Sequence, residues 1–234
     1  MAWSFQTIFL GNLLGLLLLM KLVAHKLAPT NLPLTWWLSP HLVPRHTHHS
    51  PPLHSLAFRQ FFFFLLSFFS WWLLSMSAPT WRPWLAAPLI WGSTEWLGAT
   101  FGLLTLTRSL PAIHRSPWKA ISLTDFWGRR WNVWVNAWLR LVARAVTKNR
   151  YGAFALSALF HELMFALPFQ LSTGQWYYGR MSAYFALQAL GVKLEKTLKL
   201  TGPTARVWTW LWVIVPLPLF TQGPLMAFYL GFEA

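Results

Sequence analysis

Long apolar runs constrain this chain more than any other feature of its sequence. Phe5–Val23 and Leu56–Met76 carry one charged side chain each, Lys21 and Arg59. Each run provides about the 20 residues that a helix needs to cross the hydrocarbon core of a bilayer. Only 10% of all residues are charged and 56% are hydrophobic, whereas a soluble domain carries about 25% charged residues. The sequence therefore predicts an all-α integral membrane protein.

Further apolar segments predict a polytopic helix bundle with about six to eight transmembrane segments. The remaining predicted spans are Trp84–Leu106, Tyr151–Phe169, Trp176–Val192 and a proline-interrupted stretch made of Val207–Phe220 and Pro224–Phe232. Residues 24–54 are rich in proline and histidine, so we expect a loop or an interfacial segment there. The first run lacks a basic start and a small-residue cleavage site, which favours a retained span over a signal peptide. Residues 1–234 are predicted to form one membrane-embedded domain.

The charge balance favours a membrane as the partner of the chain. There are 19 Lys and Arg against five acids, a net charge of +14, which in so apolar a chain favours anionic headgroups over nucleic acid. The basic residues gather in 108–150 and 193–206, and two predicted spans separate these regions. The positive-inside rule therefore places both in the cytoplasm, of a multi-pass protein in the endoplasmic reticulum membrane of a eukaryote or the inner membrane of a bacterium. Because cysteine is absent, disulfides, a thiolate nucleophile and a Cys-type zinc site are excluded.

The stretch "SLTDFWGRRWN", residues 122–132, combines arginines, tryptophans and an asparagine in an unusual way. It opens a segment whose large apolar residues recur every three or four positions, which predicts one amphipathic helix lying near the membrane surface. These residues are Trp127, Trp131, Trp134, Trp138 and Leu141. Asp125 is the expected N-cap of this helix, with Thr124 as the competitor. A plain interfacial anchor is the favoured explanation of the stripe taken alone, but it does not explain Asn132.

His161 lies near the middle of the fourth predicted span, in "ALFHEL". An ionisable residue at that depth is costly to insert, so it indicates a functional site, and a neutral imidazole is suited to act as a general base. Glu162 follows at about 100° around the helix and cannot serve the same contact. The alternative is a histidine that hydrogen-bonds a neighbouring helix.

These motifs resemble the wax synthase branch of the membrane-bound O-acyltransferases, over residues 115–170. "FWGRRWN" is also similar to the "FYxDWWN" pattern of sterol and diacylglycerol acyltransferases at Phe126, Trp131 and Asn132. The resemblance implies that His161 is the catalytic base and that Asn132 helps to form the site. It also implies a chamber with a cytoplasmic entrance for acyl-CoA and an acceptor that arrives from the membrane or lumen. The run "SALFHE" departs from the usual "SGLMHE" but keeps the His-Glu pair.

The predicted activity is acyl transfer from acyl-CoA, a substrate rather than a cofactor, to a lipid-soluble alcohol, giving a wax ester or a similar product. Arg129 and Arg130 are suited to bind the CoA phosphates, although for either arginine alone the positive-inside rule is at least as good an explanation. The residues Trp127, Trp131 and Glu162 are predicted to complete the substrate site. Two alternatives remain open: a non-catalytic lipid-binding or scaffolding protein, and a membrane terpene cyclase, which needs a carboxylic acid such as Glu95 or Glu162.

Two other features have less specific readings. A Pro-rich stretch carries His46, His48, His49 and His54. Histidines at this spacing can bind zinc or copper, but no carboxylate accompanies them, so we predict no metal site. Glu95, in the third predicted span, is interpreted first as a polar residue of helix packing, with the lining of a cavity or pairing with a basic residue as the alternatives.

Overall fold

The computed structural model describes residues 5–27, 53–104, 112–149 and 151–230, and these residues form helices without any strand. The longer helices are α1 (Phe5–Leu27), α3 (Leu53–Met76), α4 (Arg82–Leu104), α6 (Val133–Val146), α7 (Gly152–His161), α9 (Arg180–Thr197) and α10 (Gly202–Ile214). The short elements are η1 (Pro117–Lys119), α5 (Leu123–Asp125), η2 (Phe126–Arg130), η3 (Glu162–Ala166), α8 (Leu167–Thr173), α11 (Leu217–Thr221) and α12 (Pro224–Leu230). The predicted all-α class is confirmed.

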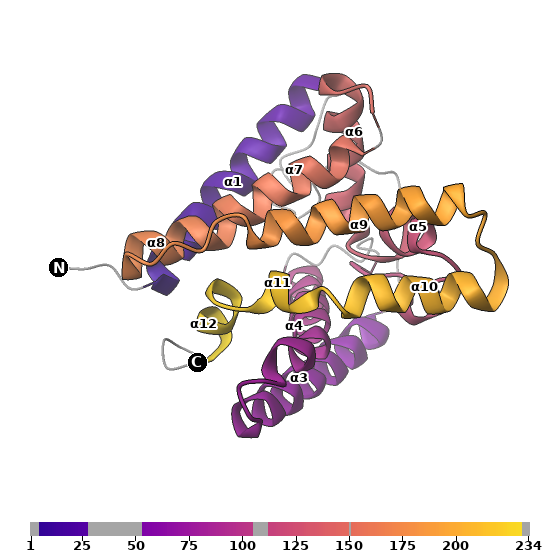
Figure 1. The fold of residues 1–234 in the computed structure, drawn as a ribbon. Coiled ribbons are helices and arrows are strands. Elements are labelled where there is room, and N and C mark those ends of the chain that lie inside the picture. Colours follow the sequence, from indigo (N-terminus) through magenta and orange to yellow (C-terminus); the bar gives the residue numbers. More distant parts are fainter. Residues whose placement is uncertain (1–4, 28–52, 105–111, 150, 231–234) are drawn as a thin grey trace.

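Helix α9 lies at the centre of the arrangement (Figure 1). On one side it packs against α7, which continues through the π-helical turn η3 into α8 and lies beside α1 and α6. On the other side α9 contacts α10 and α11, and α11 in turn contacts α4. Helices α3 and α4 form a closely packed pair. The motif segment, α5 and η2, therefore lies where α9, α10 and α6 meet.

The buried core between α1 and α8 is largely aromatic. Phe5 is fully buried and its ring meets that of Phe169 edge to face, with centroids 5.9 Å apart. One turn along, Phe9 stacks on Phe165 at 5.2 Å. Offset and edge-to-face contacts add stabilisation beyond the burial of apolar area. This core fixes α1 against the helix that carries His161.

Three helices of the described residues are long and apolar enough to cross a membrane: α1, α3 from Ala57 onwards, and the continuous α7–η3–α8. The pair 202–221 and 224–230 would add a fourth, bent by 76°, at a break where Gly223 has a φ of +76°. The six to eight predicted spans are therefore not confirmed. Helices α4 and α9 fall outside this set. The cytoplasmic placement of both basic regions relied on α9 as a span, so it stays a prediction.

The helix predicted to run on from Asp125 is interrupted, which corrects the sequence interpretation. The chain passes through η2, becomes extended at Trp131, and takes a left-handed conformation at Asn132 (φ +40°) before α6 begins. Asparagine tolerates this conformation because its short polar side chain bonds locally. Asn132 Oδ1 accepts from the Val135 amide at 3.3 Å, so Asn132 is the N-cap of α6. The caps predicted at Asp125 and Thr124 are wrong, since Ser122 caps α5.

The tryptophan stripe of α6 faces protein. Trp134 and Trp138 are buried, and the indole Nε1 of Trp138 donates to the Met20 carbonyl at 2.7 Å. Arg140 and Arg144 are exposed on the opposite side of the helix. One face of α6 is thus committed to α1 and α7, and the other carries the charge expected near headgroups.

Candidate active site

His161 lies at the end of α7 with one nitrogen already engaged. Its Nδ1 is 2.7 Å from the carbonyl oxygen of Ser157. A carbonyl only accepts, so Nδ1 carries the proton of the neutral ring and Nε2 is left as the acceptor. Within the described part of the chain, no hydrogen bond engages Nε2. This is the tautomer that a general base requires.

Aromatic rings surround this imidazole. The ring centroids of Phe185 and Phe220 lie 4.8 and 5.1 Å from it, and those of Phe160 and Phe165 lie 5.8 and 6.3 Å away. Phenylalanine carries no hydrogen-bonding group, so none of these rings competes for Nε2. The environment therefore keeps the base available to a polar group that enters.

Glu162 points away from this box and anchors α9. Its Oε1 accepts from the Gly179 and Ser182 amides at 3.0 and 2.9 Å and from the Ser182 hydroxyl at 3.0 Å. These groups form the first turn of α9, whose amides have no partner within the helix. Glu162 is 7% exposed, and its buried Oε2 accepts no hydrogen bond from the described residues. The contact that the structure shows is therefore an anchor between α7 and α9, and the predicted substrate contact stays a prediction.

The two motif arginines share one carboxylate. Asp125 is buried, and its two oxygens lie 3.1 Å from Nε of Arg129 and 2.5 Å from Nε of Arg130. The Arg129 side chain is 75% exposed, whereas that of Arg130 is 25% exposed and also reaches the carbonyls of Arg115 and Ser116 at 3.4 Å. Arg129 is thus the arginine whose outer nitrogens can meet an incoming anion, and Arg130 is largely committed to the fold.

The π-helical turn η2 is held by side chains from α6 and α9. Asn136 Nδ2 donates to the Trp127 carbonyl, and Arg140, one turn further along α6, donates to the Gly128 carbonyl at 2.9 Å. The Trp127 indole donates to Gln188 Oε1 at 3.0 Å. Asn136 and Gln188 were not identified from the sequence. The sequence did contain a signal for this role of Asn136, because Asn136 and Arg140 are four residues apart and therefore lie on one face of a helix.

The end of the motif is tied to α4 through residues 113–115. The Arg115 amide donates to the Arg130 carbonyl, and the Val133 amide donates to the Ile113 carbonyl, both at 2.8 Å. Between these bonds, the ring centroids of His114 and Trp131 lie 4.2 Å apart. Backbone hydrogen bonds to residues 113–115 therefore hold the chain both before Asn132, at Arg130, and after it, at Val133.

Glu95 anchors this pairing, as its position in α4 suggested. Its Oε1 accepts from the His114 amide at 2.5 Å and lies 3.1 Å from the ring Nδ1, and its Oε2 is 2.8 Å from Arg59. Burial lowers the pKa of the His114 imidazole, so the neutral ring donates from Nδ1 to the carboxylate. Of the interpretations of Glu95, the pairing with a basic residue is confirmed.

Asn132 and His161 are not in direct contact. The Asn132 amide uses Oδ1 as a cap, while in the described structure its Nδ2 donates to nothing. The two residues are connected instead through α9, because the ring of Phe185 lies 4.8 Å from His161 and 6.0 Å from Trp127. In the described structure, Asn132 Nδ2 and His161 Nε2 are thus a donor and an acceptor without a hydrogen bond, on two elements that both contact α9.

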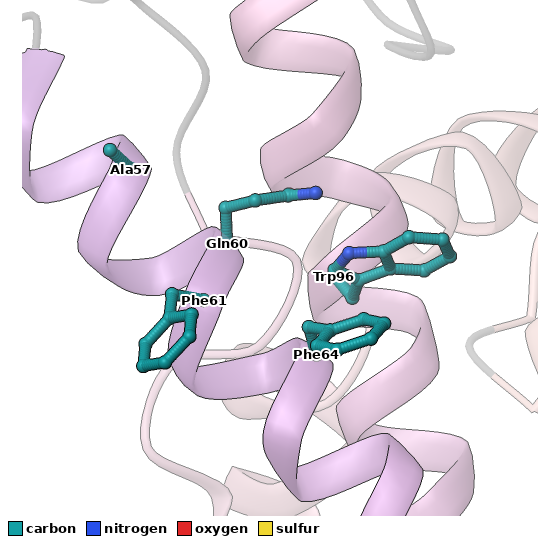
Figure 2. A pocket seen from close by; sticks show the side chains of 5 residues that line it. All are labelled: Ala57, Gln60, Phe61, Phe64 and Trp96. Carbon is teal, nitrogen blue, oxygen red and sulfur yellow. The ribbon is translucent and has the colours of Figure 1, made fainter.

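Two cavities among the described residues lie away from His161 and Asn132. One of about 550 Å³ lies beside the start of the motif and is lined by Ile121, Ser122, Arg206 and residues 200–203. The other, of about 320 Å³, lies where α3 and α4 pack together and is lined by Ala57, Gln60, Phe61, Phe64 and Trp96 (Figure 2).

No group of three metal-binding side chains occurs in the described ranges. His46, His48 and His49 lie outside them, and the side chain of His54 is not described either.

One similar protein is the probable long-chain-alcohol O-fatty-acyltransferase 3 of Arabidopsis thaliana. It is 31% identical over 121 residues, which cover 45% of this chain and 34% of the relative. The chain thus spans about a third of the length of the relative that it matches. No family profile and no solved structure matches the chain. The similarity supports a relationship to acyltransferases.

Proposed function

We propose that this protein is an O-acyltransferase that moves a long-chain acyl group from acyl-CoA to a lipid-soluble alcohol, giving a wax ester or a similar ester. The observation that carries the proposal is the state of His161, whose Nδ1 is held by the Ser157 carbonyl so that Nε2 is an unprotonated acceptor inside an aromatic box. The partial similarity to a long-chain-alcohol acyltransferase supports the same reaction class.

In the proposed reaction, Nε2 of His161 takes the hydroxyl proton of the alcohol while its oxygen attacks the thioester carbonyl. Negative charge develops on the carbonyl oxygen, and the Nδ2 group of Asn132 donates a hydrogen bond to it. Collapse of the intermediate breaks the carbon–sulfur bond, and the imidazolium returns its proton to the leaving thiolate. The products are an ester and free CoA, and no enzyme nucleophile, metal or cofactor is needed.

The exposed guanidinium of Arg129 would bind phosphates of the donor, and Arg130 would contribute mainly by fixing the turn. Trp127 and Trp131 would bound the acyl path from the motif side, and Glu162 would hold α9 against the histidine helix. The apolar spans would admit the alcohol from the bilayer. Membrane lipids are therefore the surroundings and the source of the acceptor.

A non-catalytic lipid-binding or scaffolding protein is the second candidate. It is favoured by one observation: Asn132 and Glu162 both cap helices, which is sufficient reason for a protein to keep them.

The test is transfer by the purified full chain in lipid vesicles, supplied with labelled acyl-CoA and a panel of long-chain alcohols, sterols and diacylglycerols. We expect a labelled ester with at least one acceptor, and its loss in His161→Ala at equal folded protein. An absence of ester with every acceptor, or full activity in His161→Ala, would contradict the proposal.

A further inference from the structure

Four of the five acidic residues of this strongly basic chain lie in the described ranges, and all four are buried. Glu95, Asp125, Glu162 and Glu195 are 1%, 4%, 7% and 4% exposed. A buried carboxylate is costly unless its oxygens accept hydrogen bonds. Each of these acids must therefore organise the groups around it. Glu95 and Glu195 lie outside the motif and take no part in the proposed chemistry, and Glu195 is the one of these two that bonds the motif directly.

Glu195, on α9, holds the first residues of the motif. Its Oε2 accepts from the Leu123 amide at 2.5 Å, and its Oε1 accepts from the Thr124 amide at 3.2 Å and the Thr124 hydroxyl at 2.7 Å. Leu123 is fully buried, so its amide has no access to water as a substitute. Charge-assisted bonds of this kind are about twice as strong as neutral ones. The carboxylate thus fixes where the motif begins.

The same face of α9 meets the motif twice more. Gln188, seven residues before Glu195, is fully buried, accepts from the Trp127 indole and donates to the Trp212 carbonyl at 2.6 Å. Between them, Gly191 allows a close approach, because a Cβ there would lie 2.8 Å from a methyl carbon of Leu123. Residues three, four and seven apart share one helix face. Residues from three successive turns of α9 therefore contact the motif.

A fourth residue of α9 connects this fit to the proposed base. Phe185, three residues before Gln188, lies against both His161 and Trp127. One rigid helix thus touches the imidazole at one point and the motif at three others. The position and rotation of α9 therefore determine the distance between the motif and the helix α7 that carries His161.

We propose that Glu195, assisted by Gln188, is a positioning residue that sets the motif, and with it Asn132, relative to His161. This inference rests on the proposed acyl transfer. Misplacement of a reacting group by about 1 Å costs on the order of 100-fold in rate. Loss of the Glu195 contacts therefore lowers kcat, while the binding of acyl-CoA and alcohol changes little.

The test uses the full chain in lipid nanodiscs. Glu195→Gln keeps the side-chain shape but replaces one accepting oxygen with a donor, so the Leu123 or Thr124 amide loses its partner. Thr124→Val removes only the hydroxyl bond and provides a milder second variant if Glu195→Gln folds poorly. The matched control is Lys193→Gln, an exposed change of charge on the same helix.

The first readout is amide hydrogen exchange, which does not depend on activity. In Glu195→Gln we expect exchange in residues 122–132 to become about 10- to 100-fold faster, with residues 152–161 and the Lys193→Gln control unchanged. Unchanged exchange in residues 122–132 of both Glu195→Gln and Thr124→Val overturns the inference. Because this readout needs no turnover, it decides the structural role of Glu195 even if the wild-type chain transfers no acyl group, a result that would count against the proposed function alone.

The second readout is kinetic. We expect kcat per folded protein to fall about 10- to 100-fold in Glu195→Gln, with KM values within about threefold of wild type. In an Asn132→Asp background the same change should cost much less, because residues that act through one another are not additive. Faster exchange with unchanged kcat, or fully additive losses in the double variant, would overturn the positioning role.

Discussion

His161 and Asn132, the two residues proposed to carry the reaction, are held by different kinds of contact. His161 lies on a continuous helix, among phenylalanine rings, with one backbone hydrogen bond. Asn132 follows a series of short turns whose geometry depends on buried carboxylates and amide side chains. Apolar packing tolerates changes that conserve volume, whereas a buried polar network is sensitive to the loss of a single acceptor.

This difference indicates how such a site divides its tasks. The histidine side needs an Nε2 for which no protein group competes, and the surrounding phenylalanine rings supply that environment. The asparagine side needs a donor held at a fixed place, on a stretch of chain that no regular helix could shape. A left-handed residue between a π-helical turn and α6 meets that need, and Asp125 and Glu195 bond residues of the turns that precede it.

Replacing His161 should have the largest effect. His161→Ala removes the base and should lower kcat by about 100- to 10,000-fold, while apolar packing by the four phenylalanines limits the structural damage. Ester formation per folded protein, measured with labelled acyl-CoA, checks this. His161→Gln is the control, because it fills the pocket without providing a base. A kcat within a factor of two of wild type in both variants would show that the aromatic box serves only packing.

Removing the Asn132 donor should have the next largest effect. Asn132→Asp keeps an oxygen that caps α6 and a residue that tolerates the left-handed conformation, but it loses Nδ2. We expect kcat to fall about 100-fold with the thermal unfolding temperature within a few degrees of wild type. Asn132→Ala, by contrast, also removes the cap and should lower stability by about 1 kcal/mol. Equal activities of the Asp variant and wild type would leave Asn132 as a cap alone.

Part of this architecture could be predicted from the sequence. The apolar runs identified α1, α3 and the His161 helix, because length and polarity alone determine whether a helix suits a bilayer. The helix break at Asn132 was missed, since the tryptophans keep a helical spacing across it. Which motif residues Glu195 and Gln188 hold could not be predicted, because these partners lie 61 to 72 residues away in the chain. The small number of acidic residues in so basic a chain was the one sequence signal for a structural role of these carboxylates. It did not indicate which residues they bond.

The close fit of α9 to the motif gives a stability prediction. In Gly191→Ala the new methyl group would lie 2.6 Å from the Trp212 ring and 2.8 Å from Leu123, so we expect a loss of about 1–3 kcal/mol of stability. Gly15→Ala is the matched control on α1, where nothing lies within 4 Å. It should be neutral or stabilising by up to about 1 kcal/mol. Thermal unfolding in detergent compares them, and equal melting temperatures would refute the close fit.

We expect substitutions of the two motif arginines to change different properties, each by a modest amount. Arg129→Gln removes an exposed cation and should raise the KM for acyl-CoA a few-fold, less so at high salt, without changing stability. Arg130→Gln should leave this KM nearly unchanged and lower the unfolding temperature, because its side chain bonds Asp125 and two carbonyls. Steady-state kinetics at two ionic strengths, with melting curves, checks both. The reverse pattern would exchange the roles assigned to them.

The most direct test of the account is a structure of the full chain with a ketone analogue of acyl-CoA, in which a methylene replaces the sulfur, and a long-chain alcohol. We expect the ketone oxygen to lie about 2.7–3.1 Å from Asn132 Nδ2 and the alcohol oxygen to lie within hydrogen-bond reach of His161 Nε2. Binding of the analogue at a place that contacts neither residue, or tightly packed side chains filling the space between them, would contradict it.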